Sequence, residues 1–67
     1  MSWATLPPEV RALAERVCTE KELAALKLWD AGAGYRRVGL MLDISTSTAR
    51  DRVQRALGKL ARAKDEG

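Results

Sequence analysis

Apolar side chains recur at helical spacing from the start of the chain. The first group lies on one face of a helix because its members are three or four residues apart; it consists of Leu6, Val10, Leu13, Ala14 and Val17. Pro7 and Pro8 stand at the beginning of this group, where proline is well tolerated because its missing N–H would be unpaired anyway. The pattern therefore predicts a helix over residues 8–17.

A second helix is predicted over residues 20–31. Thr19 and Glu22 have the T-x-x-E spacing of a capping box, in which each side chain accepts a hydrogen bond from the other residue's backbone. Gly32 is well placed to end the helix in a left-handed conformation. Apolar residues cover most of this helix's circumference, so we expect it to be the central, most buried one.

Two further helices follow, separated by a short turn. The first is predicted over residues 35–42, and Ser45 is a good N-cap for the second, which we expect over 46–63. Residues 64–67 are expected to form a disordered tail. The inward stripe of the last helix consists of Ala49, Val53, Ala56, Leu57 and Leu60.

These elements predict one domain over residues 1–67, a small all-α, four-helix fold that contains a helix-turn-helix. In such a unit the two helices cross closely, so the first needs a small residue, which Gly39 supplies. Val38 and Leu42 on the first helix should meet Ala49 and Val53 on the second.

Charge is distributed unevenly along the chain. Residues 1–35 hold four basic and five acidic side chains, for a net charge of −1, whereas residues 36–67 hold eight basic and four acidic ones, for +4. The basic half favours a polyanionic partner.

Catalytic and metal chemistry have few candidates in this sequence. It has no histidine, and its one cysteine, Cys18, can form no intrachain disulfide. We therefore expect no enzyme activity, no cofactor and no metal site, and Cys18 as a small apolar filler at a helix boundary. Apolar runs are too short to span a bilayer and nothing resembles a signal peptide, so a cytoplasmic protein with no membrane partner is expected.

The outer face of the last predicted helix carries the candidate DNA-binding residues. Its N-terminal part should enter the major groove and read bases through Thr46, Ser47, Arg50, Asp51 and Gln54. Arg55 and Lys59 extend a basic flank that suits phosphates.

The stretch from Thr19 to Leu60 resembles the C-terminal promoter-reading domain (region 4) of bacterial sigma factors and, more distantly, the LuxR-type helix-turn-helix domain. The most specific segments are T-E-K-E, Y-R-R-V-G and R-A-L-G-K-L. The resemblance implies that the face from Thr46 to Asp51 reads bases. It also implies phosphate contacts at Tyr35, Arg36 and Arg55.

This sequence departs from the family pattern in three places. Asp43 stands where the turn usually has glycine, and Thr46-Ser47 replace more strongly charged residues, so base discrimination should depend mostly on Arg50. Leu40 and Met41 occupy outward positions that are commonly charged. Either the N-terminal helix folds over this apolar pair, or the pair belongs to a protein interface with a second copy or with RNA polymerase.

The function predicted from the sequence is sequence-preferring binding of double-stranded DNA by a small bacterial or phage transcriptional regulator. One helix-turn-helix contacts too little surface for tight specific binding, so a homodimer or recruitment by a larger partner is expected. The alternative is a protein-interaction module that docks on RNA polymerase or another regulator and binds DNA weakly or not at all.

Overall fold

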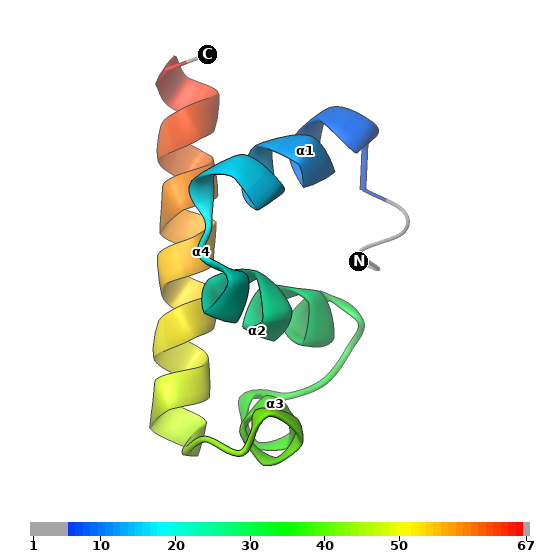
Figure 1. The fold of residues 1–67 in the computed structure, drawn as a ribbon, viewed down its shortest axis with the longest axis vertical. Helices are drawn as coiled ribbons and strands as arrows, with labels where there is room; N and C mark the ends of the chain where they lie inside the picture. Colours follow the sequence, from blue (N-terminus) through cyan, green and yellow to red (C-terminus); the bar gives the residue numbers. More distant parts are fainter. Residues whose placement is uncertain (1–5, 67) are drawn as a thin grey trace.

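The last helix is the element against which the other three pack (Figure 1). The structure is a computed structural model that describes residues 6–66. Its four helices are α1 (Pro8–Val17), α2 (Glu20–Asp30), α3 (Tyr35–Leu42) and α4 (Thr46–Glu66), and residues 6–66 contain no strand. The all-α prediction with four helices is confirmed.

Local signals in the sequence set the ends of the helices. The capping box is present: the Thr19 N–H donates to Glu22 Oε1 at 2.9 Å, and the Glu22 N–H donates to Thr19 Oγ1 at 3.2 Å. Gly32 follows α2 with a φ of 106°, which glycine adopts without strain. Ser45 caps α4 by accepting a hydrogen bond from the Thr48 N–H at 3.1 Å.

Helix α4 is longer than the sequence indicated. The predicted end at residue 63 and the tail over 64–67 are wrong as far as Glu66, because α4 continues to that residue; Gly67 lies outside the described residues. No glycine or proline interrupts the chain between Gly58 and Gly67, and Lys64 in the last turn interacts favourably with the helix dipole.

Small side chains make up most of the core, which allows the helices to approach closely. Val38 and Val53 are the largest fully buried side chains, and the other residues with no exposed surface are Ala14, Ala25, Ala49 and Ala56. The sequence predicted α2 as the central helix. The expectation that α2 is the most buried helix is confirmed, because only Glu20 and Lys21 of its residues are exposed. The other three helices pack mainly against α4, however: α2 lies in the middle of three helices along it, with α1 beside the C-terminal part of α4 and α3 across its N-terminal end (Figure 1).

The turn between α3 and α4 depends on one unusual backbone conformation and on one close approach between backbones. Asp43 has φ 56° and ψ 45°, a left-handed conformation that glycine adopts more readily than a residue with a side chain. Gly39 is packed so closely that a Cβ atom there would lie 2.8 Å from the backbone oxygen of Ile44. The prediction of a small residue at this position is confirmed, but its closest neighbour is the turn itself rather than the body of α4.

Candidate nucleic-acid interface

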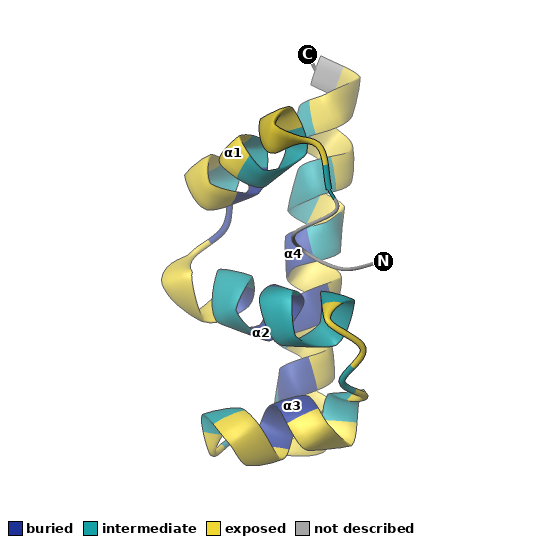
Figure 2. Cartoon of the chain, turned by 90° about the vertical axis from the view of Figure 1, so that its right-hand side faces the viewer, coloured by how far each residue is buried: buried dark blue, intermediate teal, exposed yellow. Residues whose placement is uncertain are grey.

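The predicted base-reading residues share one exposed face of α4. Thr46, Ser47, Arg50, Asp51 and Gln54 are all exposed, whereas Ala49 and Val53 on the opposite face are fully buried. Figure 2 shows the same division, with the buried positions of α4 turned towards the other helices. Packing of the apolar face therefore leaves this outer face accessible to a ligand.

Hydroxyl groups surround the N-terminal end of α4. The Ser45 hydroxyl donates to Thr48 Oγ1 at 2.8 Å while it caps the helix, and it lies 3.4 Å from the Ser47 hydroxyl. These interactions hold the start of the helix in a defined conformation, so the exposed residues of the first turn have a fixed backbone.

Arg50 is the exposed cation in the middle of this face. Its side chain forms no ion pair with an acidic side chain within residues 6–65. Its guanidinium group can therefore meet a base edge or a phosphate without first losing a partner in the protein.

Asp51 and Arg55 form an ion pair on the same helix, with Arg55 Nε 3.1 Å from Asp51 Oδ2. Both side chains are more than half exposed, and a pair of this kind contributes little to stability in water. The ion pair reduces the net positive charge of this part of α4. Because the pair is weak, Arg55 should lose little free energy when it leaves Asp51 to contact a phosphate.

Tyr35 joins three helices at the start of α3. Its ring is stacked on that of Trp29, the penultimate residue of α2, with the ring centroids 6.3 Å apart and the planes inclined by 6°. Its hydroxyl accepts a hydrogen bond from Gln54 Nε2 on α4 at 3.0 Å. The structure thus brings a predicted phosphate-binding residue and a predicted base-reading residue into contact, which the sequence did not indicate.

Lys59 is paired within the protein. Its Nζ donates to Glu22 Oε1 at 2.6 Å, across 37 residues of sequence. The sequence assigned Lys59 to phosphates and Glu22 only to the capping box, and no signal in either segment indicated that they would meet. This contact makes Lys59 a link between α2 and α4 rather than a free cation of the candidate face.

The pKa of the Glu22 carboxyl is lowered from its ordinary value. The hydrogen bond from Lys59 is the largest cause, followed by the hydrogen bond from the Thr19 N–H, and both favour the ionised form. Burial acts in the opposite direction but is outweighed. The carboxylate therefore stays charged although its side chain is only 9% exposed.

Cys18 is buried at the junction of α1 and α2, as expected of a small apolar filler. Its Sγ lies 3.9 Å from the backbone oxygen of Ala56, and burial, followed by the nearby charge of Glu22, raises the pKa of the thiol. Among the described side chains, residues 6–65, no group of three or more His, Cys, Asp or Glu residues could hold a metal ion. No helix in that range has the length and apolar character to cross a membrane.

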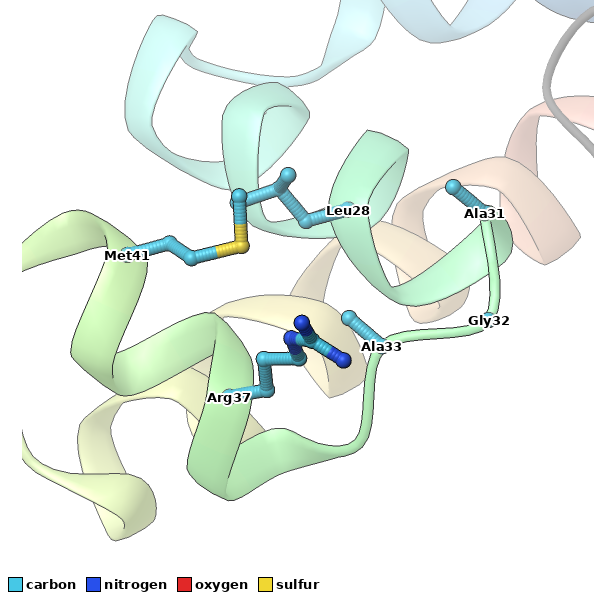
Figure 3. Close-up of a pocket in the computed structure, with 6 residues that line it drawn as sticks. All are labelled: Leu28, Ala31, Gly32, Ala33, Arg37 and Met41. Atoms are coloured by element: carbon cyan, nitrogen blue, oxygen red, sulfur yellow. The ribbon is translucent and has the colours of Figure 1, made fainter.

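Leu40 and Met41 lie uncovered on the outer side of α3, with 75% and 59% of their surfaces exposed. The expectation that the N-terminal helix folds over them is wrong, because α1 lies beside the other end of α4 (Figure 1). Met41 reaches towards Leu28 at one edge of a shallow depression between α2 and α3 (Figure 3). Arg37 also lines this depression.

Arg36 lies on the first turn of α3 and is exposed. It stands next to Tyr35, so two of the three residues that the family resemblance links to phosphates are at the same end of α3, while the third, Arg55, is on α4. Comparisons with protein families, with curated proteins and with solved structures found no match to this chain. The resemblance to the sigma factor and LuxR-type domains therefore remains a prediction from the sequence.

Proposed function

We propose that this chain binds double-stranded DNA with a preference for sequence, using α3 and α4 as a helix-turn-helix. The observation that carries the proposal is the exposed face of the first turns of α4, with Arg50 at its centre, which has no ion pair among the described side chains, and fully buried Val53 on the opposite side. The major groove is about 12 Å wide and admits one α-helix, so a helix anchored along one side can insert the other.

Base reading and phosphate binding fall to different residues in this proposal. Arg50 can donate two hydrogen bonds to a guanine, which discriminates by about 1–3 kcal/mol against the wrong base. Thr46 and Ser47 supply short hydroxyls beside it. Arg36 on α3 and Arg55 on α4 are both exposed, and in this proposal they neutralise phosphates.

A regulator of transcription in a bacterial or phage-infected cell, acting in the cytoplasm, is the role that fits such a module. A single module of this size buries only about 600–1,000 Å² of protein surface on DNA, too little for tight specific binding. We therefore propose a homodimer on DNA or recruitment by a larger partner.

A salt titration of duplex binding tests the proposal. Each neutralised phosphate contributes about −0.9 to the slope of log affinity against log salt, so two or three contacts should give a slope of about −2 to −3. Arg16→Ala is the matched control, because Arg16 is an exposed arginine on α1, away from the proposed face. Lack of duplex binding at low salt would end the proposal.

A second candidate function is a protein-interaction module that docks on RNA polymerase or another regulator. The exposure of Leu40 and Met41 favours it, because both are large apolar side chains with most of their surface in water. Combining Leu40→Glu with Met41→Arg should then reduce self-association or partner binding, measured by sedimentation and by pull-down with purified RNA polymerase. Unchanged assembly and partner binding would exclude this interface.

A further inference from the structure

We infer that Gln54 positions Tyr35 for a phosphate of the DNA backbone and does not itself read a base. The inference rests on the proposed function and assigns these two residues one shared role. It replaces the sequence-based prediction that Gln54 belongs to the base-reading set.

The geometry begins with the bond between the two side chains. Gln54 Nε2 donates to the Tyr35 hydroxyl at 3.0 Å, a normal length for this kind of hydrogen bond, and joins residues 19 positions apart. Gln54 is exposed and Tyr35 is half-buried, so the hydroxyl lies at the edge of the packed region rather than inside it.

The Tyr35 ring is held from a second direction. Trp29 stacks on it with nearly parallel planes, 6° apart. An aromatic side chain has only two rotatable bonds, so stacking on one side and a hydrogen bond at its tip together restrict where the hydroxyl can point. The hydroxyl is thus placed before any ligand binds.

The count of donors and acceptors then determines what the hydroxyl can do. A tyrosine hydroxyl has one hydrogen to donate and accepts through its lone pairs. Because it accepts from Gln54, its own hydrogen is left to donate outwards. A phosphate oxygen only accepts, and the exposed guanidinium of the neighbouring Arg36 adds a positive charge at the same end of α3.

The same bond disfavours base reading by Gln54. Glutamine recognises adenine by presenting its N–H and its carbonyl oxygen together to the base edge. Here one of the two amide N–H donors is bonded to Tyr35 on α3, and turning the amide towards a base would break that bond. Phosphate contacts fix the register of a protein on DNA and carry no direct sequence information, so the pair should act equally on all sequences.

The experiment compares Tyr35→Phe, Gln54→Ala and the double variant on duplexes chosen by selection from random sequences. Each single change should weaken binding roughly 3- to 10-fold, the effect expected for the loss of one hydrogen bond. The loss should be the same on preferred and on single-mismatch duplexes. The double variant should bind no more weakly than Tyr35→Phe. Phenylalanine keeps the stacked ring, so thermal unfolding should show a folded protein.

A phosphate scan separates positioning from a merely structural role. Replacing single phosphates by neutral methylphosphonates should identify the few positions where the parent protein loses affinity, and one of them should be the phosphate that Tyr35 contacts. Tyr35→Phe and Gln54→Ala should both be insensitive at that position, whereas Arg55→Ala should remain sensitive there. A general loss of fold would not remove sensitivity at one phosphate alone.

Two outcomes would overturn the inference while leaving the proposed function intact. One is a Gln54→Ala protein that relaxes discrimination at a single base pair, and the other is additive losses in the double variant. A parent protein that binds no duplex would end the proposed function and this inference together.

Discussion

Lys59 Nζ lies 2.6 Å from Glu22 Oε1, and the carboxylate it contacts belongs to a side chain that is only 9% exposed. Glu22 also accepts the Thr19 N–H, so one carboxylate begins α2 and attaches it to α4. The contact joins the two helices at the level of Cys18, where the chain passes from α1 to α2. It has consequences for stability that can be measured separately from DNA binding.

Lys59→Met should destabilise the fold by about 1–2 kcal/mol, because it leaves a buried carboxylate without its cation. This loss is smaller than for a fully buried ion pair, because Lys59 is 40% exposed and solvent weakens its attraction to Glu22. Urea unfolding measures the change. Duplex affinity should stay within about twofold of the parent, because loss of a hydrogen bond to a phosphate would reduce it by more than that. A loss as large as that of Arg55→Ala would show that Lys59 does bind a phosphate.

Stability should fall in acid more steeply for the parent protein than for Glu22→Gln. The pKa of Glu22 is lowered in the folded state, so its contribution is present above the carboxyl's ordinary pKa and is lost as pH falls through the folded value. Glutamine still suits the third position of a capping box, so the variant removes the titration while keeping the helix start. Melting temperatures of the two proteins should converge as the pH falls below the ordinary pKa of a glutamate, about 4.3; a constant difference would contradict the assignment.

Gly39→Ala should cost about 1–3 kcal/mol, since a Cβ 2.8 Å from the Ile44 oxygen forces the turn backbone to move. Gly58→Ala is the matched control. A Cβ at Gly58 meets nothing within 4 Å, and alanine in an exposed helix position is better than glycine by about 0.5–1 kcal/mol. Thermal unfolding should therefore show opposite signs for the two variants, and equal behaviour would mean that the turn is looser than described.

Arg50→Ala and Arg55→Ala should weaken DNA binding in different ways. The first should reduce discrimination between preferred and mismatched duplexes by about 1–3 kcal/mol. The second should weaken all duplexes alike and make the salt slope less negative by about one unit. Fluorescence anisotropy over a range of salt concentrations measures both, and identical effects on every sequence would refute the division between base and phosphate contacts.

Short-range patterns were enough to locate the helices and most of their ends. The Thr19–Glu22 box, Gly32 after α2 and Ser45 before α4 each involve groups within about one turn of helix, so neighbouring residues alone determine them. The same holds for the buried stripe with Ala49 and Val53 and for the exposed face with Arg50, which follow from helical periodicity. The end of α4 is the exception: the end of the chain favours a disordered tail, but no stop signal precedes Gly67 and the helix continues to Glu66.

Contacts between helices were beyond reach of those patterns. The bonds from Lys59 to Glu22 and from Gln54 to Tyr35 span 37 and 19 residues, and each depends on how far one helix is rotated and shifted against another. Whether α1 would cover Leu40 depended likewise on which end of α4 it occupies. Periodicity determines which side of a helix is apolar, but only the packing of small core residues against one another sets the crossing positions that decide which polar side chains meet.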